Sequence, residues 1–113
     1  MPFINVKTNV SVSKEKEVAV KSALGEAITA IPGKSEGWLM VGFEPEYRLY
    51  FKGSDEPATM VEVSIYGNAS SSALDTFTGK VDDILERELS LSPSRIYVKY
   101  VQTPDWGWNG GNF

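Results

Sequence analysis

The chain has 113 residues, of which 42% are hydrophobic and 23% charged, and this composition predicts one globular domain over residues 1-113. The formal net charge is −4 with acidic and basic residues interspersed, so no basic stripe is present and we expect no nucleic acid partner. The chain contains no Cys and no His, which excludes disulfides, thiolate nucleophiles, the usual zinc ligands and a histidine base. No apolar run reaches membrane-spanning length and the first residues lack a secretory signal. We therefore expect no membrane contact and a cytoplasmic location, with export without a signal peptide left open.

The first half of the chain predicts a strand, a helix and a further strand. Residues 2–8 are rich in β-branched and aromatic residues, and Pro2 is tolerated there because a strand's first residue need not donate to the ladder. Ser13 is a suitable N-cap for a helix that Pro32-Gly33 ends. Its apolar stripe consists of Val20, Leu24, Ala27, Ile28 and Ile31. Residues 38–43 then predict a buried strand, and residues 46–52 a shorter strand before the turn cluster of residues 53–57.

The second half repeats this plan. Residues 59–66 predict a strand, and the hydroxyls of residues 70–72 can cap the helix that follows. Its stripe consists of Leu74, Phe77, Val81, Ile84, Leu85 and Leu89. Gly79 is a weak point within that helix. After a turn at residues 92–94, residues 95–101 predict a strand in which Tyr97 and Lys99 share one face.

Two consecutive β-α-β units predict an α+β fold, a two-layer sandwich of a four-stranded mixed sheet with both helices on one face. Helices on one side cannot cover the opposite face of the sheet. We expect that face to carry apolar residues and to be buried against other subunits.

Pro2 has two interpretations. As an isolated proline it is only the first residue of a strand. If Met1 is removed, however, Pro2 carries a secondary amine on a rigid ring at a strand end. Burial in an apolar pocket and a nearby lysine would both lower the pKa of that amine, and a base with a pKa near neutrality transfers protons efficiently. Lys34 alone is typical of a solvated lysine after a helix, and Trp108 and Phe113 alone are typical of a frayed glycine-rich tail.

Six local patterns nevertheless occur in order along the chain. They are Met1-Pro2 opening a strand, Gly33-Lys34 after the first helix, Gly53-Ser54-Asp55-Glu56-Pro57 at the midpoint, Ser64-Ile65-Tyr66-Gly67 ending a strand, Arg95-Ile96-Tyr97 beginning another, and Trp-Gly-Trp-Asn-Gly-Gly-Asn-Phe at residues 106–113. In this order and spacing they resemble the macrophage migration inhibitory factor family of the tautomerase superfamily. The resemblance covers essentially the whole chain.

The resemblance implies a homotrimer around a central barrel, with active sites at the subunit interfaces and no metal or organic cofactor. It implies keto–enol tautomerisation of aromatic α-keto acids such as phenylpyruvate or of dopachrome-like substrates. Pro2 matches the family's catalytic base and Lys34 its carboxylate-binding and polarising lysine. The other matched positions are Ser64 and Ile65 through their backbone, Tyr97 from a neighbouring subunit, Trp108 and Phe113 as the roof of the pocket, and Trp38 in place of a tyrosine at its rim. Lys99 departs from the family, many members of which carry Asn there, and it adds a second cation at the mouth of the pocket.

Two other classes of function remain open. One is a cytokine-like protein whose trimer binds a protein receptor while its tautomerase activity is incidental. The other is a structural trimer with a vestigial pocket, which the intact pattern of pocket residues disfavours.

Overall fold

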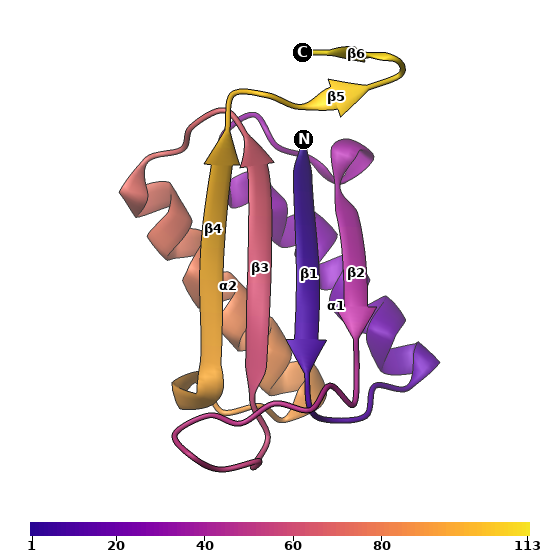
Figure 1. Cartoon of the computed structure of the whole chain (residues 1–113), viewed down its shortest axis with the longest axis vertical. Helices are drawn as coiled ribbons and strands as arrows, with labels where there is room; N and C mark the ends of the chain where they lie inside the picture. Colours follow the sequence, from indigo (N-terminus) through magenta and orange to yellow (C-terminus); the bar gives the residue numbers. More distant parts are fainter.

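The computed structural model describes all of residues 1–113 as a sheet, two helices on one of its faces and a short C-terminal hairpin (Figure 1). The main elements are β1 (Pro2–Thr8), α1 (Lys14–Ala27), β2 (Met40–Glu44), β3 (Thr59–Tyr66), α2 (Ser71–Leu89), β4 (Ile96–Thr103), β5 (Gly107–Trp108) and β6 (Gly111–Asn112). Three short 3-10 turns complete the set, namely η1 (Ile28–Ala30), η2 (Glu36–Trp38) and η3 (Pro93–Arg95).

The sheet confirms the predicted pair of β-α-β units. Its strand order is β2-β1-β3-β4, with β1 parallel to β2, β3 parallel to β4, and β1 antiparallel to β3. The two units therefore meet along the central pair β1–β3. Because β1 and β3 run in opposite directions, the first residues of β1 lie beside the last residues of β3.

Each helix begins at a serine that the sequence predicted. The Ser13 hydroxyl accepts the backbone N–H of Lys16 at 3.2 Å, and Ser70 accepts that of Ala73 at 3.1 Å. The predicted first stripe continues beyond the α-helix itself, since α1 ends at Ala27 and residues 28–30 form a 3-10 turn. The chain then reverses at Gly33, whose φ of +80° is one that a glycine adopts without strain.

The core lies between the helices and the inner face of the central strands. Both predicted stripes are buried in it, with Ala27, Leu74 and Leu89 at its margin. Fully burying each large apolar side chain contributes about 1.5–3 kcal/mol. The core consists of Ile4, Val6, Val20, Leu24, Ile28, Ile31, Val61, Val63, Ile65, Phe77, Val81, Ile84, Leu85, Leu91 and Ile96.

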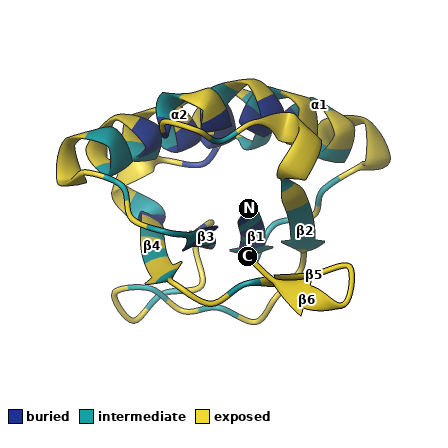
Figure 2. Ribbon diagram, turned by 90° about the horizontal axis from the view of Figure 1, so that it is seen from above, coloured by how far each residue is buried: buried dark blue, intermediate teal, exposed yellow.

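The face opposite the helices is uncovered, as expected, but it is not simply apolar. Figure 2 shows both helices on one side of the sheet and the C-terminal hairpin on the other. Lys7 and Glu62 form a 3.0 Å salt bridge across this open face, and Asn5 donates to the Glu44 carboxylate at 2.8 Å. Apolar side chains such as Met60 alternate with these polar pairs. The open face therefore carries apolar residues, as expected, together with polar and charged pairs.

The strand predicted for residues 46–52 is wrong. This segment is turn and irregular chain, with one isolated bridge between Phe51 and Ser54. Glu46 and Lys52 have φ values of 56° and 53°, which are incompatible with an extended strand. Two other predicted strand ends also move, because Trp38 lies in η2 and Arg95 in η3, outside the strands they were expected to begin.

Candidate functional site

The predicted catalytic proline lies at the first position of β1, opposite Ile65 of β3. Pro2 is buried and Met1 is half-buried. The Met1 carbonyl accepts the backbone N–H of Tyr66 at 3.1 Å, so the ladder between β1 and β3 continues one residue beyond the strand. The start of the chain is therefore held against the end of β3.

Lys34 reaches the same place from the turn after η1. Its Nζ donates to the main-chain oxygen of Tyr66 at 2.8 Å. Lys34 forms no salt bridge. A half-buried ammonium without a neutralising carboxylate therefore lies beside the first residues of β1.

The electrostatics of this end favour a neutral amine. The pKa of the Met1 amine lies below its ordinary value of 8.0, first because the amine is partly buried and then because it lies beside the charged Lys34, with which it also shares a hydrogen bond. Both causes penalise the protonated form, since burial removes its hydration and Lys34 repels it. An amine at this position is more often unprotonated at neutral pH than one in water.

Four aromatic rings gather beside Lys34 and the start of β1. The Trp38 ring lies 5.1 Å from that of Trp108 and 6.3 Å from that of Phe113, edge to face in both pairs. Phe113 also lies 6.1 Å from Trp108 and 5.6 Å from Tyr66. Trp38, Trp108 and Phe113 are each about half exposed, so the cluster presents an apolar surface rather than a closed core.

A hairpin, and not a frayed tail, carries Trp108 and Phe113 to this cluster. Asn109 and Gly110 have φ values of 52° and 86°, the paired positive values of a tight hairpin turn between β5 and β6. The backbone N–H of Phe113 then bonds to the Trp106 carbonyl at 3.0 Å. Tyr66 belongs to the same cluster but was not among the predicted site residues. The antiparallel pairing of strand ends could have indicated it, because Tyr66 follows the residue opposite Pro2.

Ser64 and Ile65 flank the site through their backbone. Ile65 is fully buried with its side chain in the core, and Ser64 lies on the open face opposite Phe3. Neither side chain meets Lys34 in a hydrogen bond. That Ser64 and Ile65 contribute main chain to the site stays a prediction, since the main-chain oxygen that Lys34 binds is that of Tyr66.

Tyr97 and Lys99 lie elsewhere in the chain. Ile65 pairs with Gln102 of β4, and Tyr97 is five residues from Gln102, which corresponds to about 16 Å along an extended strand. Tyr97 is 61% exposed and its ring lies 4.7 Å from that of Phe51. Lys99 is opposite Glu62, whose carboxylate is bound to Lys7. A single chain therefore does not bring Tyr97 or Lys99 to Pro2, and their delivery by a second copy stays a prediction.

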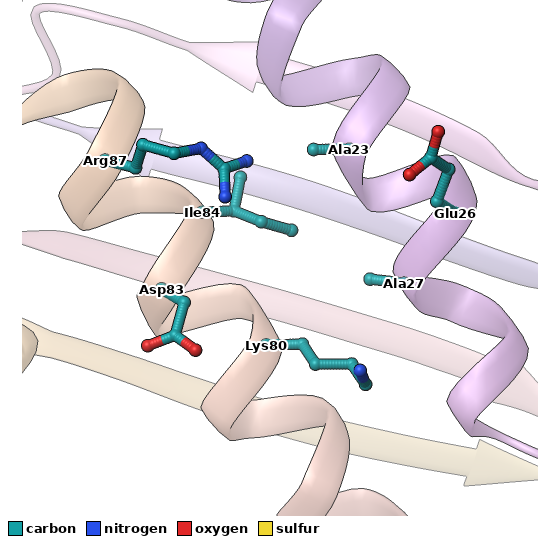
Figure 3. Close-up of a pocket in the computed structure, with 7 residues that line it drawn as sticks. All are labelled: Ala23, Glu26, Ala27, Lys80, Asp83, Ile84 and Arg87. Carbon is teal, nitrogen blue, oxygen red and sulfur yellow. The ribbon is translucent and has the colours of Figure 1, made fainter.

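Four cavities of the single chain are lined by residues away from Pro2. A groove of about 310 Å³ opens between α1 and α2 on the helix layer, where Glu26 and Ala27 face Lys80, Ile84 and Arg87 (Figure 3). A smaller apolar hollow of about 160 Å³ lies beside Tyr97 and Phe51. No group of three or more acidic side chains is arranged to hold a metal ion. Neither helix has the length and apolar character needed to cross a membrane.

Comparisons with known proteins match the chain over its whole length. The sequence profile of the family described as "Macrophage migration inhibitory factor (MIF)" matches residues 1–113. The macrophage migration inhibitory factor of Meriones unguiculatus is 29% identical over 115 residues, which cover 100% of this chain and 99% of the relative. The crystal structure of Leishmania major MIF2 is 32% identical with a TM-score of 0.93 and covers 100% of this chain and 97% of the relative. A homologue from Prochlorococcus marinus is 28% identical with a TM-score of 0.84, and the match covers 98% of both chains.

Proposed function

Because the chain belongs to the macrophage migration inhibitory factor family, we propose that it is a cofactor-independent keto–enol tautomerase acting on aromatic α-keto acids such as phenylpyruvate. In this proposal Met1 is removed and the amine of Pro2 is the general base. The single observation that supports it most directly is the lowered pKa of the amine at the start of the chain, caused by burial and by Lys34.

The proposed proton transfer takes place at the ring nitrogen of Pro2. A neutral amine takes a proton from the carbon next to the keto group, and negative charge develops on the keto oxygen. The protonated Pro2 then returns that proton to the oxygen, which gives the enol and restores the neutral amine. The reverse sequence converts the enol into the keto form. Pro2 is more deeply buried than Met1, so its amine would experience the same desolvation that lowers the pKa of the Met1 amine.

Lys34 would bind the substrate carboxylate and stabilise the developing negative charge. An ammonium carries three N–H donors, of which Lys34 uses one on the Tyr66 carbonyl and shares another with the Met1 amine. Once Met1 is removed, two donors would be available to a substrate anion. That anion would also be attracted by the unneutralised charge of Lys34.

The aromatic cluster would hold the substrate ring. Trp38, Trp108 and Phe113 present edges and faces within 5.1–6.3 Å of one another, a spacing suited to further aromatic contacts. The same rings lower the local dielectric constant and so strengthen the attraction between Lys34 and a carboxylate.

A homotrimer would complete the site. Tyr97 and Lys99 are too far along β4 to reach the Pro2 of their own chain, whereas a neighbouring copy can supply them. Lys99 would then add a second cation at the mouth of each pocket and favour anionic substrates.

The test compares the unmodified chain with Pro2→Gly. Intact-mass measurement first establishes that Met1 is removed from both proteins, and the rate of phenylpyruvate ketonisation is then measured. We expect a loss of about 10²–10⁴-fold, the usual contribution of a positioned general base. Pro45→Gly changes an exposed proline after β2 and should retain full activity. Equal turnover by Pro2→Gly, or a retained Met1 in an active enzyme, would refute the proposal.

A second candidate is a cytokine-like ligand of a protein receptor, with tautomerisation incidental. It is favoured by the name of the 29% identical relative, which refers to inhibition of macrophage migration. The Pro2→Gly variant separates the two functions. A cell response that persists in the catalytically inactive variant supports receptor binding, and a response lost in parallel with turnover supports catalysis.

A further inference from the structure

Arg95 binds an unusual set of partners for an arginine. Its guanidinium donates four hydrogen bonds to main-chain oxygens of the loop between β2 and β3. Nε bonds to the Pro57 carbonyl at 2.8 Å, and one terminal nitrogen bonds to that of Phe51 at 3.1 Å. The other terminal nitrogen bonds to the carbonyls of Ser54 at 3.2 Å and Glu56 at 3.0 Å. Arg95 forms no salt bridge, and four of its five N–H donors are used on this one loop.

The same guanidinium also fixes an aromatic ring. The Arg95 Cζ lies 5.3 Å from the centre of the Phe51 ring, within the range of a cation–π contact. The Lys52 Nζ lies 5.5 Å from the centre of the same ring. The Tyr97 ring also lies against Phe51, with ring centres 4.7 Å apart and planes inclined at 48°. Arg95, Phe51 and Tyr97 thus form a continuous stack.

Tyr97 depends on this stack for its orientation. Its side chain is 61% exposed, and its hydroxyl forms no hydrogen bond within the chain. Besides its contact with Phe51, the Tyr97 ring lines an apolar hollow. The other residues that line this hollow are Leu49, Tyr50, Ala58, Thr59 and Met60. An exposed ring with no polar anchor adopts the rotamer that its apolar neighbours select.

We propose that Arg95 is a positioning residue, which holds the loop of residues 49–57 so that Phe51 orients the Tyr97 ring for the substrate pocket of a neighbouring copy. This inference rests on the proposed function in one respect, namely that Tyr97 serves a second copy's site. Arg95 does not touch the substrate and acts only through Phe51.

An arginine is required because of the geometry of its donors. The planar guanidinium directs five N–H groups in fixed directions and stacks on an aromatic face, whereas a lysine ammonium has three donors around one point. Lysine at position 95 would keep the charge but could not serve four carbonyls and the Phe51 ring together. Arg95→Lys should therefore fail to restore what Arg95→Gln loses.

The first test needs no turnover. In the full-length protein, amide hydrogen exchange is measured at Phe51 and Ser54, whose N–H groups each bond to the other's carbonyl, together with the ring-proton shifts of Tyr97 that the Phe51 ring produces. Arg95→Gln and Arg95→Lys are each expected to speed exchange at least tenfold and to move the Tyr97 shifts towards solvent values. Arg87→Gln is the matched control, because Arg87 is an exposed arginine paired only with Glu88. Unchanged exchange and unchanged Tyr97 shifts in both Arg95 variants would overturn the proposal.

The second test uses the kinetic constants. Arg95→Gln should raise KM for phenylpyruvate about tenfold while kcat stays within twofold, and Phe51→Leu should do the same. Since Arg95 acts through Phe51, the double variant should be no worse than either single variant. Multiplying effects in the double variant, or an unchanged KM with a mobile loop, would refute the positioning role. If Arg95→Gln does not form the oligomer, the same KM and kcat comparison is made with Arg95→Lys. Failure of the proposed function can be told apart from failure of the Arg95 proposal. If the proposed function is wrong, turnover does not depend on Pro2, but the hydrogen-exchange rates and Tyr97 shifts still respond to the Arg95 variants.

Discussion

The Nζ of Lys34 lies 2.8 Å from the main-chain oxygen of Tyr66, and this one hydrogen bond joins the turn after the first helix to the end of β3. It holds a positive charge beside the amine at the start of β1, with which Lys34 shares a further hydrogen bond. The bond also sets Lys34 at the base of the aromatic cluster, because Tyr66 contacts Phe113.

The first prediction concerns the carboxylate of the substrate. Lys34→Ala should lower kcat/KM for phenylpyruvate more than for its methyl ester, because only the acid has a full negative charge for Lys34 to bind. A hydrogen bond to a charged group contributes about 1.5–3 kcal/mol, so the ratio of the two kcat/KM values should change by about 10–100-fold. Steady-state kinetics on both substrates measures it, with Lys21→Ala on exposed α1 as a control. An unchanged ratio would remove Lys34 from the carboxylate site.

The second prediction concerns the pH profile. A base works when unprotonated, so kcat/KM should rise with pH and level off above the pKa of the amine. Because burial and Lys34 lower the pKa of the Met1 amine at this end, the same causes should place the midpoint below the pKa of a prolyl amine exposed to water. Lys34→Ala removes the repulsion of the protonated form and should move the midpoint upward. A midpoint that moves downward or not at all would show that Lys34 does not tune the base.

The third prediction concerns the aromatic wall. Trp108→Ala removes the ring that lies 5.1 Å from Trp38 and 6.1 Å from Phe113. An aromatic pair contributes about 0.5–1.5 kcal/mol beyond burial, so KM for phenylpyruvate should rise about 3–10-fold at nearly constant kcat. A smaller aliphatic α-keto acid should be less affected. An equal loss for both substrates would indicate that the hairpin acts on the fold rather than on the substrate ring.

The fourth prediction concerns two glycines. Gly79 lies inside α2 with open space where a Cβ would be, so Gly79→Ala should stabilise the protein by about 0.5–1 kcal/mol. Gly33 has φ +80°, a backbone conformation that is strained for alanine. Gly33→Ala should therefore destabilise the protein by about 1–2 kcal/mol, although the added Cβ would meet no neighbouring atom. Denaturant unfolding at one fixed protein concentration measures both changes. The same sign for the two variants would contradict this account.

The fifth prediction concerns Asp82, whose buried Oδ1 has no hydrogen-bond partner. Burial first, and then Asp83 and Glu86, raise the pKa of this carboxyl in the folded protein above 3.8. Because the carboxyl ionises at a lower pH in the unfolded state, the folded state loses stability as pH rises above 3.8, and the loss is complete once pH exceeds the raised pKa. Well below pH 3.8 both states are protonated and no penalty exists. Asp82→Asn should therefore raise the melting temperature at pH 7, and the gain should vanish below pH 3.8. Asp105→Asn, an exposed control, should show no such pattern, and a gain that persists in acid would exclude titration as its cause.

Local features of the fold were predictable because they depend on neighbours in sequence. Ser13 and Ser70 precede apolar stripes of helical period, and capping and burial followed from those patterns. The segment of residues 46–52 was mispredicted, because its composition suits a strand while Glu46 and Lys52 adopt positive φ values that nothing in their residue types requires. Its carbonyls bond to Asn9 and Arg95, which are far away in the sequence.

The sequence by itself determined the two β-α-β units, the core stripes and the family resemblance, since periodicity and ordered motifs are properties of the chain alone. Only the tertiary structure decided that Tyr66 joins Lys34 and Phe113, that the glycine-rich tail forms a hairpin, and that Tyr97 lies about 16 Å along the sheet from the end that holds Pro2. These relationships depend on the register between strands and on side chains that meet across tens of residues. The energy of such contacts is not encoded in any local window of sequence.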